Sequence, residues 1–259
     1  MKARIINAQT ALLAAGMIAL LTTLTAEAGA GSQQNPGVLP PNSSPFGASY
    51  SQWSERWWQW VFSLPVGQHP LFDTADVSAG QKGQVWFLGG NFTGRPETRN
   101  VTIPPGIALF FPVLNRWADN TDCSGGQIVS DGFSEASIRE FIGGLQDQAR
   151  NLSCTIDGTA VRGLSDPVLT PYRVQTPTPG GFSYSLPGTD NLLDFLGATC
   201  WTDSSGAPIQ VDAAIYHPVG DGVYLMLAPL SVGTHRIHFH GEAGSFVEDI
   251  LYNITVAGD

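Results

Sequence analysis

Charge is scarce in this sequence of 259 residues, and lysine is nearly absent. Only 13% of the residues are Asp, Glu, Lys or Arg, against about 25% in a typical domain, and Lys82 is the only lysine after Lys2. The formal net charge is −10. No basic patch could then offset the repulsion of nucleic-acid phosphates, which excludes a nucleic-acid-binding function. Apolar residues make up 42% of the chain, which is enough for a core and too much for a disordered protein.

Common catalytic motifs are missing as well. The sequence contains no Gly-x-Ser-x-Gly motif, phosphate-binding loop, dinucleotide-binding fingerprint or His-Glu-x-x-His motif. Its cysteines, Cys123, Cys154 and Cys200, show no Cys-x-x-Cys spacing, which argues against a redox motif or a thiolate zinc site. In an exported chain two of them are expected to form a disulfide, and the sequence does not choose among the three pairings.

Residues 1–28 have the pattern of a secretory signal peptide. Lys2 and Arg4 precede an uncharged apolar stretch over residues 11–25, and residues 26–28, Ala-Glu-Ala, have the small-x-small form of a cleavage site. The apolar stretch is too short for a membrane-spanning helix. We therefore predict a secreted or periplasmic protein with no transmembrane segment after signal cleavage.

A leader and a single domain are predicted to follow. Residues 29–47 contain mostly Gly, Ser, Asn, Gln and Pro, which indicates a flexible leader, and residues 48–259 form the domain. Its first element is a helix over residues 50–62, in which five apolar side chains share one face at helical spacing. These are Tyr50, Trp53, Trp57, Trp60 and Val61. Apolar residues at i, i+3 and i+4 positions predict a second, inserted helix over residues 134–151.

The rest of the domain has the features of short strands separated by turns. Strands are predicted over residues 84–88, 100–103, 108–113, 153–156, 159–162, 172–175, 182–186, 211–217, 223–228, 234–240 and 246–256. Gly and Pro mark the turns, and strands do not alternate regularly with helices as in a parallel α/β fold. The pattern predicts a mainly β protein, a β-sandwich of the Ig or jelly-roll kind with a Trp-rich amino-terminal helix and one inserted helix.

Several short motifs are spread over residues 48–256. They are Tyr50-x-x-Trp53-x-x-x-Trp57-Trp58-x-Trp60, Pro70-Leu71-x-Asp73, Val85-Trp86-Phe87-Leu88, Pro104-x-Gly106-x-Ala108-Leu109-Phe110-Phe111-Pro112-x-Leu114-Asn115, Cys154-x-Ile156-Asp157-Gly158 and Pro229-Leu230-x-x-Gly233-x-His235-x-Ile237-His238-Phe239. Together they resemble a widespread, uncharacterised family of exported bacterial proteins with a Trp-rich amino-terminal helix and a carboxy-terminal Gly-x-His-x-Ile-x-Phe hairpin. The resemblance implies a single domain over this range and carries no activity with it.

The segment 235–242 holds three of the five histidines in the chain. Alternate side chains of a β-strand point to opposite faces, so His238 and His240 share one face and Ile237 lies on the other. The following strand is expected to fold back as a hairpin with Ile237 opposite Ile250. This register would bring a carboxylate from the last strand next to the two imidazoles.

In that register Asp249 lies opposite His238, with His240 nearby. Two imidazole nitrogens and one carboxylate form a ligand set that suits a divalent transition metal such as zinc, copper or iron. Glu242 is then a candidate general base in a metal-dependent enzyme. The alternative is that these histidines lie on the exposed face of a terminal hairpin and are hydrogen-bonded to their neighbours.

Polar and aromatic residues directly follow the predicted strand 108–113. Side chains at the end of a buried strand have a rigid support, which a binding or catalytic loop needs. We predict that Arg116 binds a carboxylate or sugar hydroxyls and that Trp117 stacks on the ligand. Asp119 is a candidate acid, base or calcium ligand. The alternative is an Asn/Asp-rich turn that caps its own backbone.

The tryptophans of the first helix are either core residues or a ligand platform. Trp53, Trp57 and Trp60 are predicted to pack in the core, since each can bury about 150–250 Å². Trp58 lies at the margin of the apolar face and is predicted to be the most exposed of the four. Its ring would then be free to stack on the apolar face of a ligand.

These observations favour an exported binding module for carbohydrate or cell-envelope material, with Trp58, Arg116, Trp117 and Asp119 as ligand-binding residues. A secreted metal-dependent enzyme, hydrolytic or oxidative, is the first alternative. It would use one divalent transition metal held by the histidine segment. A structural surface protein without a small-molecule site is the second alternative. The sequence leaves the ligand and the oligomeric state open.

Overall fold

The computed structural model describes residues 35–72, 77–123 and 127–258. The predicted signal peptide, residues 1–28, lies outside the described residues. These described residues belong to one compact unit. None of the helices in the described part of the chain combines the length and the apolar character that a membrane-spanning helix needs.

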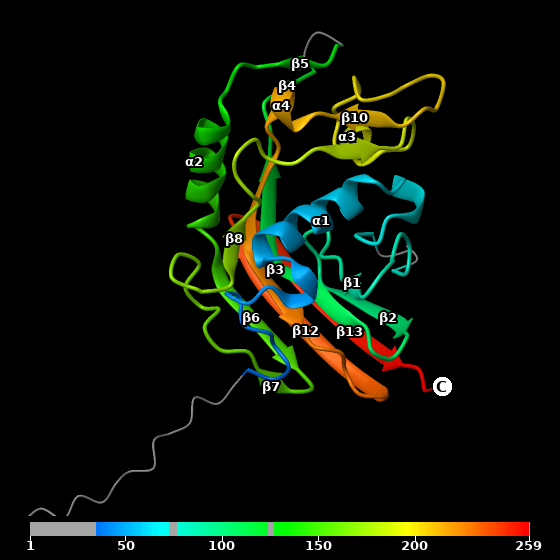
Figure 1. Cartoon of the computed structure of the whole chain (residues 1–259), viewed down its shortest axis with the longest axis vertical. Coiled ribbons are helices and arrows are strands. Elements are labelled where there is room, and N and C mark those ends of the chain that lie inside the picture. The colour runs from blue at the N-terminus through cyan, green and yellow to red at the C-terminus, as the bar shows by residue number, and fades with distance from the viewer. Residues whose placement is uncertain (1–34, 73–76, 124–126, 259) are drawn as a thin grey trace, which may run out of the picture. The chain divides into compact units, whose positions relative to one another are not determined.

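Two β-sheets contain the long strands of the protein (Figure 1). The first sheet has the strand order β1 (Val85–Phe87), β3 (Ala108–Ala118), β11 (Val219–Leu227) and β8 (Arg173–Gln175). The second has the order β2 (Glu97–Ile103), β13 (Phe246–Val256), β12 (Gly233–Ala243), β6 (Arg150–Ile156) and β7 (Thr159–Ala160). β1 runs parallel to β3 and β13 runs parallel to β2, while the remaining pairs in these sheets are antiparallel. The prediction of a mainly β protein is confirmed.

The two sheets pack face to face around a hydrophobic core. Adjacent residues of β3 point to opposite faces of the first sheet. The Phe111 ring stacks on Phe239 of β12, with the ring centroids 5.1 Å apart, and thereby links the two sheets. The Phe110 ring stacks on Tyr224 of β11 at 5.3 Å, on the face that helix α1 covers. Because both faces of the first sheet are covered, β11 is buried along its whole length, and the predicted β-sandwich is confirmed.

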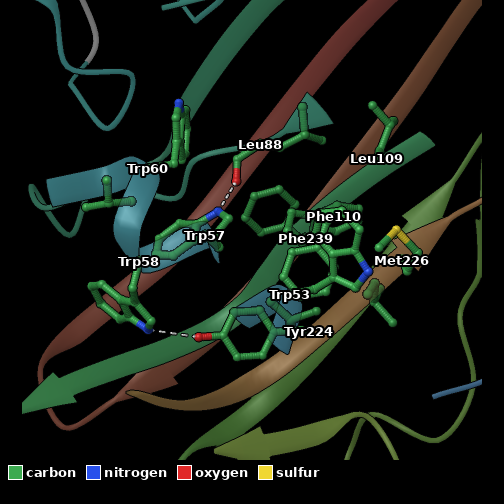
Figure 2. Packing of buried hydrophobic residues seen from close by; sticks show 14 of the residues in the cluster. Trp53, Trp57, Trp58, Trp60, Leu88, Leu109, Phe110, Tyr224, Met226 and Phe239 are labelled. Carbon is green, nitrogen blue, oxygen red and sulfur yellow. Dashed lines mark hydrogen bonds between the residues drawn. The ribbon is translucent and has the colours of Figure 1, made fainter. Parts of the chain in front are cut away.

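Helix α1 (Tyr50–Phe62) covers the outer face of the first sheet, as Figure 2 shows. Trp53, Trp57 and Trp60 are buried, as predicted. The Trp57 indole N–H donates a hydrogen bond of 3.0 Å to the carbonyl oxygen of Leu88, just after β1. The buried rings therefore position the helix through polar contacts as well as through packing.

Trp58 is also buried, which contradicts the prediction that it would be exposed. The residue is only 6% exposed. Its indole N–H donates a hydrogen bond of 3.1 Å to the Tyr224 hydroxyl (Figure 2), and its ring stacks on Phe62 at 5.7 Å. The physical reason is that α1 contacts β9 (Tyr184–Leu186) and β8 as well as β11, so the margin of its apolar face is covered too.

Shorter elements surround the sandwich. Two-stranded sheets are formed by β4 (Thr121–Asp122) with β5 (Val129–Ser130) and by β9 with β10 (Ile209–Val211). The remaining helices are α2 (Glu135–Gln146), α3 (Leu192–Phe195), α4 (Ala213–Tyr216) and the 3₁₀ turns Pro45–Gly47 and Val66–Gln68. Helix α2 is the predicted inserted helix and packs against β11 and β3. It ends before the predicted boundary at residue 151 because β6 already begins at Arg150.

The strand predicted over residues 211–217 is wrong for most of its length. Val211 ends β10, and helix α4 follows. The Asp212 side chain accepts a hydrogen bond of 2.9 Å from the backbone N–H of Ala214 and so caps the helix. His217 ends it in the left-handed conformation, at φ 46°. A local cap thus outweighs the weak alternation of apolar residues in this segment.

Of the predicted flexible leader over residues 29–47, the structure describes residues 35–47, and this part differs from the prediction. Val38 is 4% exposed and forms a β-bridge with Leu227. The backbone N–H of Leu39 donates to the carbonyl oxygen of Met226 at 2.8 Å. The apolar pair Val38 and Leu39 therefore extends the hydrogen bonding at the end of β11, and the described part of the leader, from residue 35, lies against the domain.

One disulfide is present, between Cys123 and Cys200, which selects one of the three pairings left open by the sequence. It connects the strand β4 region to the segment after α3. Cys154 on β6 is the free thiol and is buried. Burial raises the pKa of this thiol to about 12, so it stays protonated and unreactive in the folded protein.

Candidate functional site, a cleft around Arg116

The candidate site lies beside the part of β3 that β1 leaves uncovered. β1 pairs with β3 only from Ala108 to Phe110. After Leu88 the chain turns away through Gly89 and Gly90 towards the second sheet. The later residues of β3 therefore have no pairing with β1, and a cleft opens at this point between α1, β3 and the start of β13.

The cleft consists of two adjoining cavities of about 200 and 310 Å³. Both are lined by Trp58, Phe92, Asn115 and Arg116, and we call them together the Arg116 cleft. The smaller cavity also contacts Asn91, Phe246 and Glu248, and the larger one contacts Trp117, Phe141 and Leu192. Aromatic walls with a few convergent polar groups are typical of small-molecule sites of this size.

Arg116 has no hydrogen-bond partner among the described residues for its buried Nε atom. Its nearest charge is Asp221, the residue opposite it on β11. That carboxylate is already bound by Arg173, at 3.0 and 2.9 Å, and by Gln175 at 3.0 Å. Burial lowers the pKa of Arg116, although an arginine remains charged in proteins. The guanidinium is thus a partly buried cation whose donors are free for a ligand.

Trp58 and Asn115 are held in place by a single buried hydroxyl. The Tyr224 oxygen accepts hydrogen bonds of 3.1 Å from the Trp58 indole and of 3.1 Å from the Asn115 amide. Burial raises the pKa of Tyr224 beyond its ordinary range, so the hydroxyl remains neutral. The wall of the cleft next to Arg116 is therefore fixed before any ligand binds.

Glu248 contributes a buried carboxyl group to the other side of the cleft. It lies on the inner face of β13, is 5% exposed, and accepts a hydrogen bond of 2.9 Å from the backbone N–H of Asn91. Removal from water raises its pKa to about 8, and the nearby charges of Glu97 and Asp249 act in the same direction, against the opposing effect of Arg99. The carboxyl group is therefore protonated at neutral pH.

The backbone at Gly90 lies close to the Glu248 carboxyl group. A Cβ atom at Gly90 would lie 2.5 Å from Glu248 Oε2. The neighbouring Gly89 is fixed on both sides, because its carbonyl oxygen accepts from Arg99 Nη1 at 2.9 Å and its N–H donates to the Tyr252 hydroxyl at 3.0 Å. Arg99 also forms a buried ion pair with Glu97 on the same strand, β2. This network holds the rim of the cleft rigidly.

The structure brings three of the four predicted ligand-binding residues to this cleft. Trp58, Arg116 and Trp117 all line it. The Trp117 ring packs edge-on against Phe62 at 5.0 Å, so it forms a wall rather than an open stacking platform. Asp119 lines a separate cavity of about 280 Å³ near Phe133 and Phe141.

Asp119 behaves largely as a turn residue. Its Oδ1 atom accepts hydrogen bonds from the backbone N–H and the hydroxyl of Thr121, at 3.0 and 2.6 Å. Burial raises the pKa of Asp119, and the hydrogen bonds from Thr121 oppose this shift. Burial, followed by the Asp119 carboxylate, raises the pKa of Tyr184. This geometry matches the alternative prediction of a turn that caps its own backbone.

His238 and His240 lie on the outer face of β12, and neither lines the Arg116 cleft. The register differs from the prediction, since Phe239 rather than Ile237 is opposite Ile250. The shift is two residues, so every side chain keeps its predicted face. Hairpin register is set by the turn between the strands, and the position of this turn was not evident from the sequence.

The predicted metal ligands do approach one another. His238 Nε2 lies 2.6 Å from Asp249 Oδ1, and His240 Nδ1 lies 3.9 Å from Asp249 Oδ2. Among the described residues, however, no group of three or more His, Cys, Asp or Glu side chains has an arrangement that could hold a metal ion. The arrangement as it stands matches the alternative of exposed histidines bound to their neighbours.

Glu242 is placed poorly for the predicted role of general base. Its carboxylate accepts hydrogen bonds from Asn151 Nδ2 at 2.9 Å and from Arg150 Nε at 3.1 Å. The Asn151 bond, followed by those from Arg150 and His240, lowers the pKa of Glu242. A carboxylate whose pKa is lowered is a weaker base than an ordinary glutamate.

Three charged residues near the cleft, Glu248, Glu97 and Arg99, were not predicted from the sequence. All three are charged residues at inward positions of strands whose other inward residues are apolar or aromatic. For Glu248 the signal was available, because it shares the parity of Ile250 within the correctly predicted strand 246–256. The strand predicted over 100–103 began too late to include the other two residues.

No protein-family model, no curated protein and no solved structure matches this chain. The resemblance seen over residues 48–256 therefore stays a prediction, and one of its motif residues, Asp73, lies outside the described residues. The function of the Arg116 cleft has to be argued from its geometry.

Proposed function

We propose that this protein is an exported binding module that holds a carbohydrate in the Arg116 cleft. The observation that carries the proposal is Arg116 itself. It is a partly buried guanidinium that has no partner for its Nε atom among the described residues, in a cleft with aromatic walls. A cation left without a partner in such a place costs stability unless a ligand satisfies it.

The composition of the cleft suits a sugar. A sugar ring has apolar faces made of C–H groups and a rim of hydroxyls, so it needs both aromatic contact and hydrogen-bonding groups. Phe92 and Phe246 offer the apolar surface, while Asn115, Arg116 and Glu248 offer polar groups. The combined size of the two cavities lies in the range of small-molecule sites.

One further feature supports export. The Cys123–Cys200 disulfide is a bond that forms in oxidising compartments and is rare in the cytosol. The proposed location is therefore the periplasm or the extracellular space, as the amino-terminal sequence predicts.

The two alternative functions have less support. A metal-dependent enzyme would need His238, His240 and Asp249 to rearrange around an ion, because Asp249 now binds His238 directly. A structural surface protein would have no use for a cleft lined by an arginine whose buried Nε atom has no partner among the described residues. Both alternatives stay as predictions.

Retention on a panel of immobilised polysaccharides tests the proposal. The wild-type protein is expected to be retained on at least one of them, and Arg116→Gln is expected to weaken the retention about tenfold, because a charged hydrogen bond to the ligand is lost. Arg95→Gln is the matched control, since Arg95 is exposed and the same charge is removed. Equal retention of all three proteins, with equal urea unfolding midpoints, would contradict the proposal.

A further inference from the structure

We infer that the ligand of the Arg116 cleft is an acidic sugar whose carboxylate binds Arg116 beside Glu248. This inference rests on the proposed function and names its ligand class. It depends on three features of the cleft, namely the charges that line it, the geometry of its polar groups and the position of its glutamate.

The charge balance of the cleft leaves one cation unpaired. Arg116 and Glu248 are the only two ionisable side chains among the described residues that line the two cavities. Four other arginines of the described chain have a carboxylate within 3.1 Å: Arg99, Arg139, Arg150 and Arg173. Arg116 stands apart from them, since its neighbour Asp221 is already bound by Arg173. A ligand that brings its own carboxylate would give Arg116 the kind of partner that these four arginines have within the protein.

The guanidinium has the geometry for such a partner. Its planar fork of N–H donors matches the two oxygens of a carboxylate, and pairs of this kind are shorter and stronger than bonds to neutral hydroxyls. Neutral hydroxyls would satisfy single donors of Arg116 and leave its charge uncompensated. A carboxylate is therefore the better partner at a site that is partly removed from water.

The position of Glu248 is compatible with a carboxylate bound to Arg116. The Asn91 N–H occupies its Oε1 atom, which leaves Oε2 to carry the proton. A protonated carboxyl group can donate a hydrogen bond to an anion, whereas an ionised one would repel it. The burial that keeps Glu248 protonated at neutral pH thus prepares the cleft for a negatively charged ligand.

The overall charge of −10 does not decide the question. At physiological ionic strength charges are screened over a Debye length of about 8 Å. The contact between a partly buried guanidinium and a bound carboxylate is much shorter than this, so the local interaction dominates the equilibrium. The distant negative charges slow the approach of an anion more than they weaken its binding.

Titration calorimetry with two matched pairs of sugars tests the inference. D-glucuronate is compared with D-glucose, and D-galacturonate with D-galactose. The members of each pair differ only at C6, where the acidic sugar has a carboxylate and the neutral sugar has a hydroxymethyl group. The acidic member of at least one pair is expected to bind about tenfold or more tightly. Arg116→Gln is expected to remove this preference, Arg116→Lys to keep part of it, and Arg95→Gln to leave it unchanged.

The possible outcomes separate the inference from the function on which it rests. If neutral and acidic sugars bind equally well, the inference is overturned and the carbohydrate proposal survives. If no sugar binds, both fail together. If hexanoate binds as tightly as glucuronate, the ligand is a carboxylate but not a sugar, and the assignment to acidic sugars is overturned.

A pH series adds a second readout that a purely structural role of Glu248 would not affect. The glucuronate affinity is expected to fall as the pH rises from about 7 to 9, when Glu248 loses its proton. The charged groups around it are Arg99, Glu97 and Asp249 on the second sheet and Arg116 across the cleft. Glu248→Gln keeps a neutral donor and should bind with little pH dependence. An equal fall in this variant would overturn the role assigned to Glu248.

Discussion

Glu248 and Asp249 are adjacent carboxylic acids on β13, and the two faces of one sheet give them different chemistry. Glu248 points inward, is 5% exposed, and has its pKa raised to about 8 by burial. Asp249 points outward, and its side chain is 30% exposed and paired with His238 at 2.6 Å. Adjacent residues of a strand point to opposite faces, so a neutral acid buried in a cleft is followed directly by a residue in an ordinary surface ion pair.

This contrast indicates which face of the sheet holds the groups with altered chemistry. The histidine cluster was the basis for the alternative of a metal-dependent enzyme, because histidine side chains are common metal ligands. On the outer face, however, they lie in a high-dielectric environment that screens their interactions. The inner face holds fewer charges, and each of them has a larger effect because water is excluded.

The largest expected effect comes from breaking the buried ion pair on the inner face. Arg99→Met removes the guanidinium that pairs with Glu97 and that donates to the Tyr252 hydroxyl and to the Gly89 carbonyl oxygen. We expect a loss of about 3–5 kcal/mol in the free energy of unfolding, measured with urea. Arg150→Met is the control, because that arginine is exposed in its pair with Glu242, and it should cost less than about 1 kcal/mol. Equal losses of unfolding free energy in the two variants would show that the inner and outer ion pairs stabilise the protein equally.

A methyl group added beside Glu248 should have the next largest effect. The new Cβ in Gly90→Ala would overlap the carboxyl group, and overpacking of this kind costs about 1–3 kcal/mol. The double variant Gly90→Ala, Glu248→Ala should lose less than the sum of the single changes. Gly144→Ala is the control, since its Cβ meets open space on helix α2, and it should gain about 0.5–1 kcal/mol. Strict additivity of the two changes would show that these residues do not touch.

The pH dependence of stability should identify Glu248 as the buried acid. Its folded pKa of about 8 lies above the ordinary value of 4.5, so between these values the native state binds more protons than the unfolded state. Stability therefore falls as the pH rises, by up to about 1.4 kcal/mol per pH unit. Glu248→Gln should remove this slope.

The interval between about pH 6.5 and 8 is the best place to measure it. Buried His69, whose pKa is lowered to about 4 from 6.5, gives a slope of opposite sign at lower pH only. His235, whose pKa is raised by Asp157, is present in the wild type and in Glu248→Gln. Its effect on stability therefore cancels when the two proteins are compared. A wild-type slope that persists in Glu248→Gln would assign the buried proton to another group.

The smallest effect is expected on the outer face. Asp249→Asn removes the ion pair with His238, in which the two side chains are 30% and 48% exposed. The free energy of unfolding should change by less than about 1 kcal/mol, and less still in 1 M salt, where charges are screened within about 3 Å. A loss comparable to that of Arg99→Met would mean that the outer cluster is a structural centre.

Much of the fold was predictable because local patterns agree with it. The helix over 50–62 has both a periodic apolar face and a capping residue, and the last strand, 246–256, has clear alternation. The segment 211–217 could not be assigned correctly, because the cap at Asp212 competes with a weak strand pattern. Trp58 was assigned to the surface, because an isolated helix does not reveal how many sides of it are covered.

The candidate site was predictable only in part. Arg116 and Trp117 were identified from their position after a buried strand, and both line the cleft. Glu248 was missed, although it interrupts the apolar face of its strand. The sequence could place it on the inner face but not beside Arg116, which lies more than a hundred residues earlier in the chain.

The mainly β character, the helices α1 and α2 and the alternating faces of the last hairpin could be predicted, because these follow from local periodicity and steric preference. The Cys123–Cys200 pairing, the register of the last hairpin and the placement of Arg116 and Glu248 on one cavity could not be predicted. Each of these joins distant segments, and which segments meet depends on how two sheets and a helix share one core. Burial then decides the protonation state of Glu248, since a carboxyl group removed from water retains its proton.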